Sequence, residues 1–147
     1  MKKLLFLLPF IIWAFTCIAH AQEAEKDAVR VPLENYIKAH ATGDPEFARK
    51  AFHTEGNMIW IRDRKYSSET FDSFIKRAFT GKPAADEEKR KDGRRIEAVD
   101  ISGNAAVARI VLDYPSVKFI DYMTLLKING EWKIVNKSFY AEPKRTQ

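Results

Sequence analysis

Apolar residues recur at helical spacing in three stretches of the first half of the chain, and this periodicity predicts three helices. The first helix runs to about Ala41, and Pro32 lies either in its first turn or at a kink. The second begins after Asp44, which can cap it, with Pro45 at its first position, and it ends at Gly56. The two apolar stripes consist of Val29, Leu33, Tyr36, Ile37 and His40, and of Phe47, Ala48, Ala51 and Phe52.

The third helix has the most regular pattern, with apolar residues at i, i+3, i+4, i+7 and i+8. Ser67 caps this helix and Gly81 ends it. Between the second and third helices, residues 58–61 have the composition of a strand, and residues 62–64 indicate a turn into a short return strand. The apolar face of the third helix consists of Phe71, Phe74, Ile75, Ala78 and Phe79.

The second half of the chain is dominated by strands. A charged stretch at 82–95 mixes acidic and basic side chains, which is typical of a solvated loop. Four strands follow, joined by short turns, and short connections make neighbouring strands antiparallel. The pattern predicts an α+β fold in which N-terminal helices pack on a strongly curved, mainly antiparallel sheet. The four strands are 95–101, 105–114, 117–128 and 131–140.

Asn129-Gly130 predicts a two-residue turn between the last two strands, and this turn sets their register. Counting back from the turn places Asp121 on the same sheet face as Leu125 and Ile134. A carboxylate on a core-facing surface needs a partner or a function, so Asp121 is the first candidate for a functional residue. The predicted cross-strand pairs are Lys127 with Trp132, Leu125 with Ile134, Met123 with Asn136, and Asp121 with Ser138.

The opposite face of the same hairpin is also rich in apolar residues. Three helices cannot cover both faces of the sheet, so this pattern predicts a homodimer through the outer sheet face. The alternative is an ordinary exposed face with scattered apolar residues. The predicted outer-face residues are Ile120, Tyr122, Thr124, Leu126, Ile128, Val135 and Phe139.

The N-terminus has the three parts of a secretory signal peptide. Two lysines near the start are followed by an apolar segment at 4–18, and Ala19-His20-Ala21 supplies the small-x-small pattern of a cleavage site. The apolar segment is too short for a comfortable membrane span, and no stop-transfer pattern follows it. We therefore predict a signal peptide over 1–21 and a single domain over 22–147. The protein is expected to be exported, periplasmic or secreted, with no membrane anchor after cleavage near Ala21.

Composition narrows the classes of function. The single cysteine lies in the predicted signal peptide, so the exported protein has neither a disulfide nor thiol chemistry. Cleavage removes two lysines and lowers the formal charge from +5 to +3, which gives no case for a nucleic-acid partner. The sequence lacks a Gly-rich phosphate loop, nucleophile-elbow spacing and paired metal ligands. We therefore predict no cofactor and no metal site.

Four stretches of the chain resemble a known group of proteins. They are similar to the nuclear transport factor 2-like superfamily of cone-shaped α+β domains, also described as SnoaL-like or cystatin-like cones, which includes ketosteroid isomerases and polyketide cyclases. Within this superfamily the chain resembles the bacterial putative lumazine-binding family. The resemblance implies a cone with an internal pocket for a small ligand, and it departs at Asp63-Arg64, where relatives often have an Asp-Gly turn. The matching stretches are Tyr36-Ile37 with residues 42–44, residues 51–56, residues 101–108, and Asp121-Tyr122 with residues 130–137.

Asp121 and His53 are the candidate catalytic residues. In a water-poor cone, desolvation would make the Asp121 carboxylate a competent general base near neutral pH. Alternatively, Asp121 accepts hydrogen bonds from Ser138 or Asn136 and has a structural role. His53 follows the second helix, so it pairs with Asp121 as an acid–base couple, holds the polar edge of a ligand, or caps the helix C-terminus. His40 is interpreted as a satisfied core or rim residue.

Aromatic side chains from helices and strands could line a pocket suited to a flat ligand. Simple core packing is the alternative for most of them, because aromatic residues at these spacings are usually core. The predicted ligand-binding residues are Trp60, Tyr66, Phe74, Phe119, Met123, Asn136 and Ser138.

The leading hypothesis is an exported domain that binds a small, mostly apolar or flat heterocyclic ligand. The first alternative is a cofactor-free isomerase, dehydratase or cyclase that uses Asp121 or His53 as its general base. The second is a protein-interaction module of the cell envelope without a functional pocket. Whether the protein catalyses a reaction is left open by the residues.

Overall fold

The computed structural model describes the backbone of residues 8–144 and the side chains of residues 23–144. The two lysines of the predicted signal peptide lie outside the described residues. The described chain forms four α-helices, one short 3-10 helix (η1) and six strands. Their bounds are α1 Leu8–Thr42, α2 Pro45–Ala51, β1 Phe52–Arg62, β2 Lys65–Thr70, α3 Phe71–Ala78, α4 Glu87–Arg90, η1 Lys91–Gly93, β3 Arg94–Ser102, β4 Ala105–Asp113, β5 Val117–Ile128 and β6 Glu131–Pro143.

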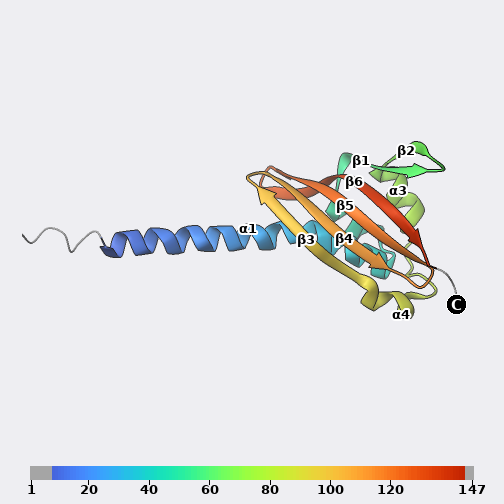
Figure 1. Ribbon diagram of the computed structural model, residues 1–147, viewed down its shortest axis with the longest axis horizontal. Helices are drawn as coiled ribbons and strands as arrows, with labels where there is room; N and C mark the ends of the chain where they lie inside the picture. Colours follow the sequence, from blue (N-terminus) through green and yellow to red (C-terminus); the bar gives the residue numbers. More distant parts are fainter. Residues whose placement is uncertain (1–7, 145–147) are drawn as a thin grey trace, which may run out of the picture.

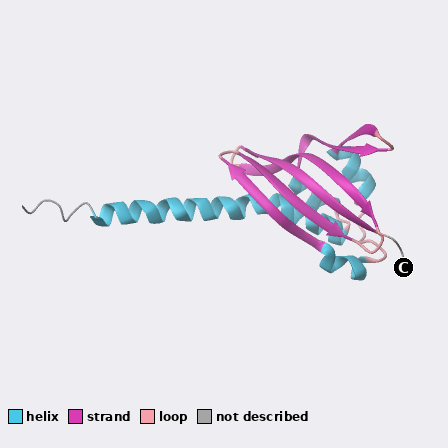
Figure 2. Cartoon of the chain, viewed as in Figure 1, coloured by secondary structure: helices cyan, strands magenta, loops and turns pink. Residues whose placement is uncertain are grey.

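The strands form one six-stranded sheet in the order β2-β1-β6-β5-β4-β3. β1 and β6 run parallel to each other, and every other neighbouring pair is antiparallel. The sheet is curved, and α1, α2 and α3 lie on one side of it (Figures 1 and 2). The predicted fold class, with N-terminal helices on a strongly curved, mainly antiparallel sheet, is confirmed. The four C-terminal strands agree with the predicted bounds to within three residues at each end.

Helix α1 is continuous from Leu8 to Thr42 and passes through Pro32, so it does not begin at that proline as one prediction had it. Its N-terminal part projects away from the sheet (Figure 1). Its C-terminal part packs on the sheet, with Val29, Leu33 and Tyr36 fully buried. Among the helices of residues 8–144, none has both the length and the apolar character needed to cross a membrane.

Helix α2 begins as predicted but ends earlier. The Asp44 side chain accepts a hydrogen bond from the Glu46 backbone N–H at 2.9 Å, with Pro45 at the start of the helix. The helix ends at Ala51 instead of Gly56, because Phe52 already pairs with β6 as the first residue of β1. Gly56 has a different role from the one predicted. A Cβ at this position would lie 2.5 Å from the Phe71 ring, so the glycine allows the ring to pack against the strand.

Helix α3 begins three residues later than predicted. Thr70 is its cap and accepts a hydrogen bond from the Ser73 backbone N–H at 3.3 Å, whereas Ser67 lies in β2. The reason is that residues 65–70 pair with β1 as the predicted return strand, and the helix starts where that pairing ends. The β1–β2 turn uses Asp63 and Arg64 at positive φ angles of 50° and 63°. The short hairpin therefore forms without the glycine that relatives often have there.

The β5–β6 hairpin contains a bulge that changes the predicted register. Near the turn the predicted pairs of Lys127 with Trp132 and of Leu125 with Ile134 are confirmed. Beyond them Val135 is an extra residue in β6, so Met123 pairs with Lys137 instead of Asn136, and Asp121 pairs with Phe139 instead of Ser138. Because side chains alternate between the faces, a one-residue shift exchanges the faces of all the following residues. Lys137 and Phe139 therefore face the helices, and Phe139 does not belong to the outer face where it was predicted.

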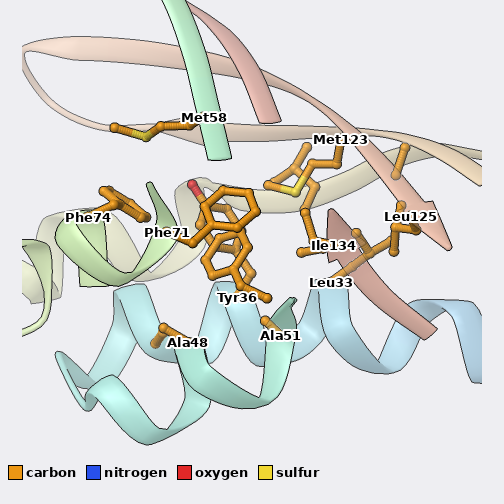
Figure 3. Close-up of a cluster of buried hydrophobic side chains, with 14 of the residues drawn as sticks. Leu33, Tyr36, Ala48, Ala51, Met58, Phe71, Phe74, Met123, Leu125 and Ile134 are labelled. Carbon is orange, nitrogen blue, oxygen red and sulfur yellow. The ribbon is translucent and has the colours of Figure 1, made fainter. Parts of the chain in front are cut away.

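The core lies between the helices and the inner face of the sheet. Figure 3 shows Tyr36 and Leu33 of α1 beside Ile134 of β6 and Leu125 of β5. All four side chains are fully buried. Burial of each large apolar side chain stabilises the fold by about 1.5–3 kcal/mol. This packing holds α1 at a fixed height above the sheet.

The charged stretch at 82–95 is only partly the solvated loop that was predicted. It contains α4 and η1, and its last residues enter β3. The Arg94 side chain is 2% exposed and forms an ion pair with Glu87 at 2.6 Å. It also donates hydrogen bonds to the Tyr114 hydroxyl and to the His40 carbonyl oxygen. Arg94 thereby ties the charged stretch to the end of α1.

Candidate functional site

Three polar side chains meet in the core: Tyr36 from α1, Asp121 from β5 and Lys137 from β6. The Tyr36 hydroxyl donates a hydrogen bond to Asp121 Oδ2 at 2.6 Å. Lys137 Nζ donates to the Tyr36 hydroxyl at 2.7 Å and lies 3.1 Å from the same carboxylate oxygen. The relative exposures are 0%, 0% and 5%, so water screens none of these charges. We call these three residues the buried cluster.

The bulge in β6 is what assembles the buried cluster. Asp121 is paired with Phe139 and Lys137 with Met123, so Asp121 and Lys137 are diagonal neighbours on one sheet face. Without the extra residue Val135, Lys137 would face the opposite side of the sheet. A buried ion pair also needs further partners to offset its desolvation. Tyr36 supplies one of these partners to each of the two charged groups.

Aromatic rings complete the surroundings of Lys137. Its ammonium nitrogen lies 5.0 Å from the ring centroids of Tyr36 and Phe139 and 5.3 Å from that of Phe74. Such contacts stabilise a desolvated cation by up to about 2 kcal/mol. Burial, the Asp121 charge and the hydrogen bond to Asp121 raise the pKa of Tyr36 well above its ordinary range. Tyr36 therefore stays protonated and acts as the donor to Asp121.

A cavity of about 660 Å³ lies against the buried cluster. It is bounded by α1, α3 and the inner face of the sheet, and its rim is formed by the β1–β2 turn and the end of β6. Its walls are mainly apolar and include six Phe, Tyr or Trp side chains, with Lys137 and His40 as the inner polar groups and Arg62 and Arg77 nearer the rim. The Trp60 and Phe139 rings are stacked at 5.6 Å between centroids. The main lining residues are Tyr36, His40, Trp60, Arg62, Phe74, Arg77, Phe119, Lys137, Phe139 and Tyr140.

Two buried nitrogen atoms in the cavity walls make no hydrogen bond within the described chain: Nε2 of His40 and Nε1 of Trp60. Behind the cavity, Oδ1 of Asp121 is likewise buried and without a protein partner among residues 23–144. Native proteins rarely leave such atoms unsatisfied, so each one calls for an explanation. His40 and Trp60 both line the cavity, so a small shift of either side chain would bring its nitrogen atom to a ligand or water held there.

His40 lies between the Tyr36 and Phe79 rings, with centroid distances of 4.7 and 5.1 Å and edge-to-face geometry. Because Nε2 of His40 makes no hydrogen bond within the described residues, the interpretation of His40 as a satisfied core residue is wrong for this atom. Burial, and then the positive charges of Lys137, Arg94 and Arg90, lower the pKa of His40 well below its ordinary value. His40 is thus a neutral imidazole at neutral pH, able to donate or accept one hydrogen bond at Nε2.

Three of the seven predicted pocket residues line this cavity, namely Trp60, Phe74 and Phe119. Tyr66 is 68% exposed on β2, and Met123 is packed in the core. Asn136 bonds to the backbone and side-chain oxygens of Asn57, and Ser138 borders a shallow groove on the outer face. Asn136 and Ser138 were assigned to the pocket on the register that the bulge changes.

The two candidate catalytic residues are not brought together. Asp121 bonds to Tyr36, whereas His53 Nδ1 accepts a hydrogen bond from the Glu55 backbone N–H at 3.3 Å. His53 follows the inward-facing Phe52 in β1, so it points to the opposite side of the sheet. The buried polar groups that the sequence analysis missed are Lys137, Tyr36 and His40. Tyr36 and His40 were visible as members of one helical stripe, whereas nothing in the sequence marks the bulge that turns Lys137 inward.

A second hollow of about 900 Å³ lies between α1 and β3, at the other end of the sheet. Charged side chains contribute to its lining, and two of them, Glu25 and Lys127, already pair with each other at 2.7 Å. The unsatisfied buried nitrogen atoms of His40 and Trp60 border the first cavity and not this hollow. Residues 23–144 contain no group of three potential metal ligands. The cavity beside the buried cluster is therefore the candidate site.

The fold and the cavity define a class of protein: a cone-shaped α+β domain with a cavity between its sheet and its helices. Residues 24–140 match the sequence profile of the family described as putative lumazine-binding, and the chain belongs to this family. This confirms the family resemblance and the nuclear transport factor 2-like fold.

Solved structures and one curated protein extend the comparison. A nuclear transport factor 2-like protein of unknown function from Shewanella baltica is 26% identical and covers 82% of this chain and 96% of its own, with a TM-score of 0.72. One from Methylobacillus flagellatus is 28% identical and covers 81% of this chain and 93% of its own, with a TM-score of 0.68. The aldolase FrzH from Cladobotryum sp is 24% identical over 131 residues, which are 85% of this chain and 98% of that protein.

Proposed function

We propose that the cavity beside the buried cluster binds a small, flat ligand with a polar edge. The observation that carries this proposal is that two residues lining one cavity, His40 and Trp60, each have a buried nitrogen atom, Nε2 and Nε1, without a hydrogen-bond partner among the described residues. A hydrogen bond to each atom would remove a desolvation penalty of about 1–3 kcal/mol. Family membership supports the proposal, because the family is described as putative lumazine-binding.

The cavity has the size and the chemistry of a ligand site. Its volume of about 660 Å³ lies inside the range of about 300–1,000 Å³ that is typical of small-molecule pockets. Trp60, Phe119 and Phe139 line the cavity, so a conjugated ring system held there would contact aromatic side chains. The buried cluster stiffens the inner end, so little conformational entropy is lost when a ligand is held there.

Isothermal titration calorimetry with lumazine as the probe tests this proposal. We expect saturable binding with one probe per chain. Trp60→Phe keeps a ring but removes the Nε1–H donor, so we expect its affinity to fall about tenfold or more. Tyr66→Phe is the matched control, because Tyr66 is exposed on the neighbouring strand and does not line the cavity. Equal affinity of both variants and the wild type, or no binding at all, would contradict the proposal.

A second candidate function is carbonyl chemistry without a cofactor, such as an isomerase, dehydratase, cyclase or aldol-type reaction. The specific observation in its favour is the match to the aldolase FrzH, which spans nearly all of that protein. In this case Asp121, which does not line the cavity, would take the proton through the Tyr36 hydroxyl, to which it is hydrogen-bonded. Proton exchange at the α-carbon of acetophenone in heavy water, followed by NMR, tests it. Exchange that is no faster with wild type than with Asp121→Asn would argue against this function.

We also propose that the protein is exported after cleavage near Ala21. The family match begins at residue 24, so the preceding segment lies outside the domain that the family shares. Among residues 23–144, Glu25 is the first whose side chain makes long-range hydrogen bonds, which it accepts from Trp132 Nε1 at 2.5 Å and Lys127 Nζ at 2.7 Å. N-terminal sequencing of the protein recovered from the cell envelope or medium should begin at Gln22. An intact Met1 start would refute the proposal.

The outer sheet face is the proposed homodimer surface. Val107, Tyr122 and Leu126 are apolar, lie on adjacent strands and are 55%, 54% and 38% exposed. A second copy of the same face would bury them around a two-fold axis. Sedimentation of the wild type should give the mass of a dimer at micromolar concentration, and Tyr122→Lys should give that of a monomer. A monomeric wild type would end this proposal.

A further inference from the structure

We propose that the polar edge of the ligand is an oxyanion, such as a deprotonated enol, phenol or cyclic imide, bound by the ammonium group of Lys137 at the inner end of the cavity. The inference rests on the proposed ligand-binding function and specifies the chemical class of the ligand. It assigns Lys137 as the anion-binding residue and Asp121 as the counter-ion of Lys137.

The position of the ammonium group is the first argument. Lys137 Nζ lies 5.0–5.3 Å from the centroids of the Tyr36, Phe74 and Phe139 rings. All three rings also line the cavity, so the charge of Lys137 is at the cavity wall. An ammonium group has three N–H donors. One bonds to Tyr36 and a second faces Asp121 Oδ2, which leaves a third for a ligand.

The inventory of donors and acceptors is the second argument. Trp60 Nε1 can only donate, and it is unsatisfied among the described residues. His40 Nε2 can donate as a neutral imidazole. The Asp121 carboxylate belongs to the buried cluster and does not line the cavity. The residues that line the cavity therefore include N–H donors from three elements, α1, β1 and β6, and this set suits a negatively charged oxygen.

The charges around the inner cavity also favour an anion. Lys137, Arg94 and Arg90 are the charged groups that act most strongly on His40, and all three are positive. Toward the rim, the charged lining residues are Arg62 of β1, Asp63 of the β1–β2 turn and Arg77 of α3, and Arg77 is paired with Glu69 of β2. At about 5 Å and an effective dielectric constant of about 20, attraction between an ammonium and an oxyanion changes affinity by roughly a hundredfold.

The ionisation of bound lumazine, followed by its absorbance, tests the inference. Lumazine contains an acidic cyclic imide, and its neutral and anionic forms differ in absorbance. We expect the bound probe to ionise at a pH at least one unit below that of free lumazine, which means that the anion binds at least tenfold more tightly than the neutral form. Binding with an unchanged or raised ionisation pH would overturn the oxyanion inference but leave the proposed function intact. Absence of binding at every pH would instead overturn the proposed function.

Variants of the Asp121–Lys137 ion pair also test the inference, because they are expected to change the affinity for the anion in opposite directions. Asp121→Asn retains the ammonium but removes its counter-ion, so we expect the anion to bind several-fold more tightly. The double variant Asp121→Asn with Lys137→Met removes both charges and avoids an unpaired buried charge. We expect this double variant to lose the preference for the anion while still binding the neutral probe. Weaker anion binding by Asp121→Asn, or a full preference in the double variant, would contradict the assignment.

Discussion

Removal of the Lys137 ammonium is the most informative perturbation of the fold. Lys137→Met keeps an apolar stem of similar length but leaves Asp121 fully buried, with the Tyr36 hydroxyl as its only described hydrogen-bond donor. Breaking one side of a buried ion pair costs about 3–5 kcal/mol. For a domain of this size, about 4 °C of melting temperature corresponds to each kcal/mol, so we expect a decrease of about 12–20 °C. Urea unfolding at pH 7, followed by circular dichroism, measures the free energy of unfolding directly.

A control and a double-mutant cycle make this prediction specific. Lys127→Met removes a lysine from the same hairpin, but the ion pair of Lys127 with Glu25 is about one-third exposed. We therefore expect the free energy of unfolding to fall by less than about 1 kcal/mol. Asp121→Asn combined with Lys137→Met should recover much of the stability lost by either single variant. Additive losses in the cycle, or a Lys137→Met protein as stable as the Lys127→Met protein, would refute the account of the buried cluster.

Two further predictions concern residues beside the cluster. Because the pKa of His40 is lowered in the folded state, the unfolded chain binds the extra proton first, and stability should decrease by up to about 1.4 kcal/mol per pH unit as the pH falls below about 6.5. His40→Gln should reduce the fall in melting temperature between pH 7 and pH 5, whereas His53→Gln should not. The same dependence of melting temperature on pH in both variants would contradict the assignment. Gly56→Ala should destabilise by about 1–3 kcal/mol, because the new methyl group would lie 2.5 Å from the Phe71 ring, and a thermal melt unchanged from wild type would count against this packing.

The sequence predicted the elements of the second half closely because each carries a local signal. Short turns such as Asn129-Gly130 mark the strand ends, and alternation then places Asp121 on the inner face. The bulge at Val135 has no such signal. It depends on β6 pairing with β5 on one side and β1 on the other, and the β1 ladder is irregular at the same level. A Cβ on Gly56 would lie 2.7 Å from the Val135 carbonyl oxygen, so the two strands meet closely there.

That single irregularity explains two of the four errors in the predicted pocket. It exchanged Asn136 and Ser138 for Lys137 and Phe139 on the inner face. The error in placing His53 came from the end of α2. Residues 52–56 were predicted to continue that helix, but their pairing with β6 overrides the helical pattern and turns His53 outward. In both cases the pairing of strands that are distant in the sequence determined the local structure, which local propensity alone does not predict.

The fluorescence of Trp60 offers the most direct test of the central claim that the cavity is a ligand site. Cleavage at Ala21 leaves Trp60 and Trp132 as the only tryptophans of the mature sequence, so Trp132→Phe makes Trp60 the sole reporter. Trp60 lines the cavity, and a flat ring stacked beside it should quench its emission. We predict saturable quenching by lumazine with one probe per chain. Emission that stays unchanged up to millimolar lumazine in the folded protein would contradict the claim.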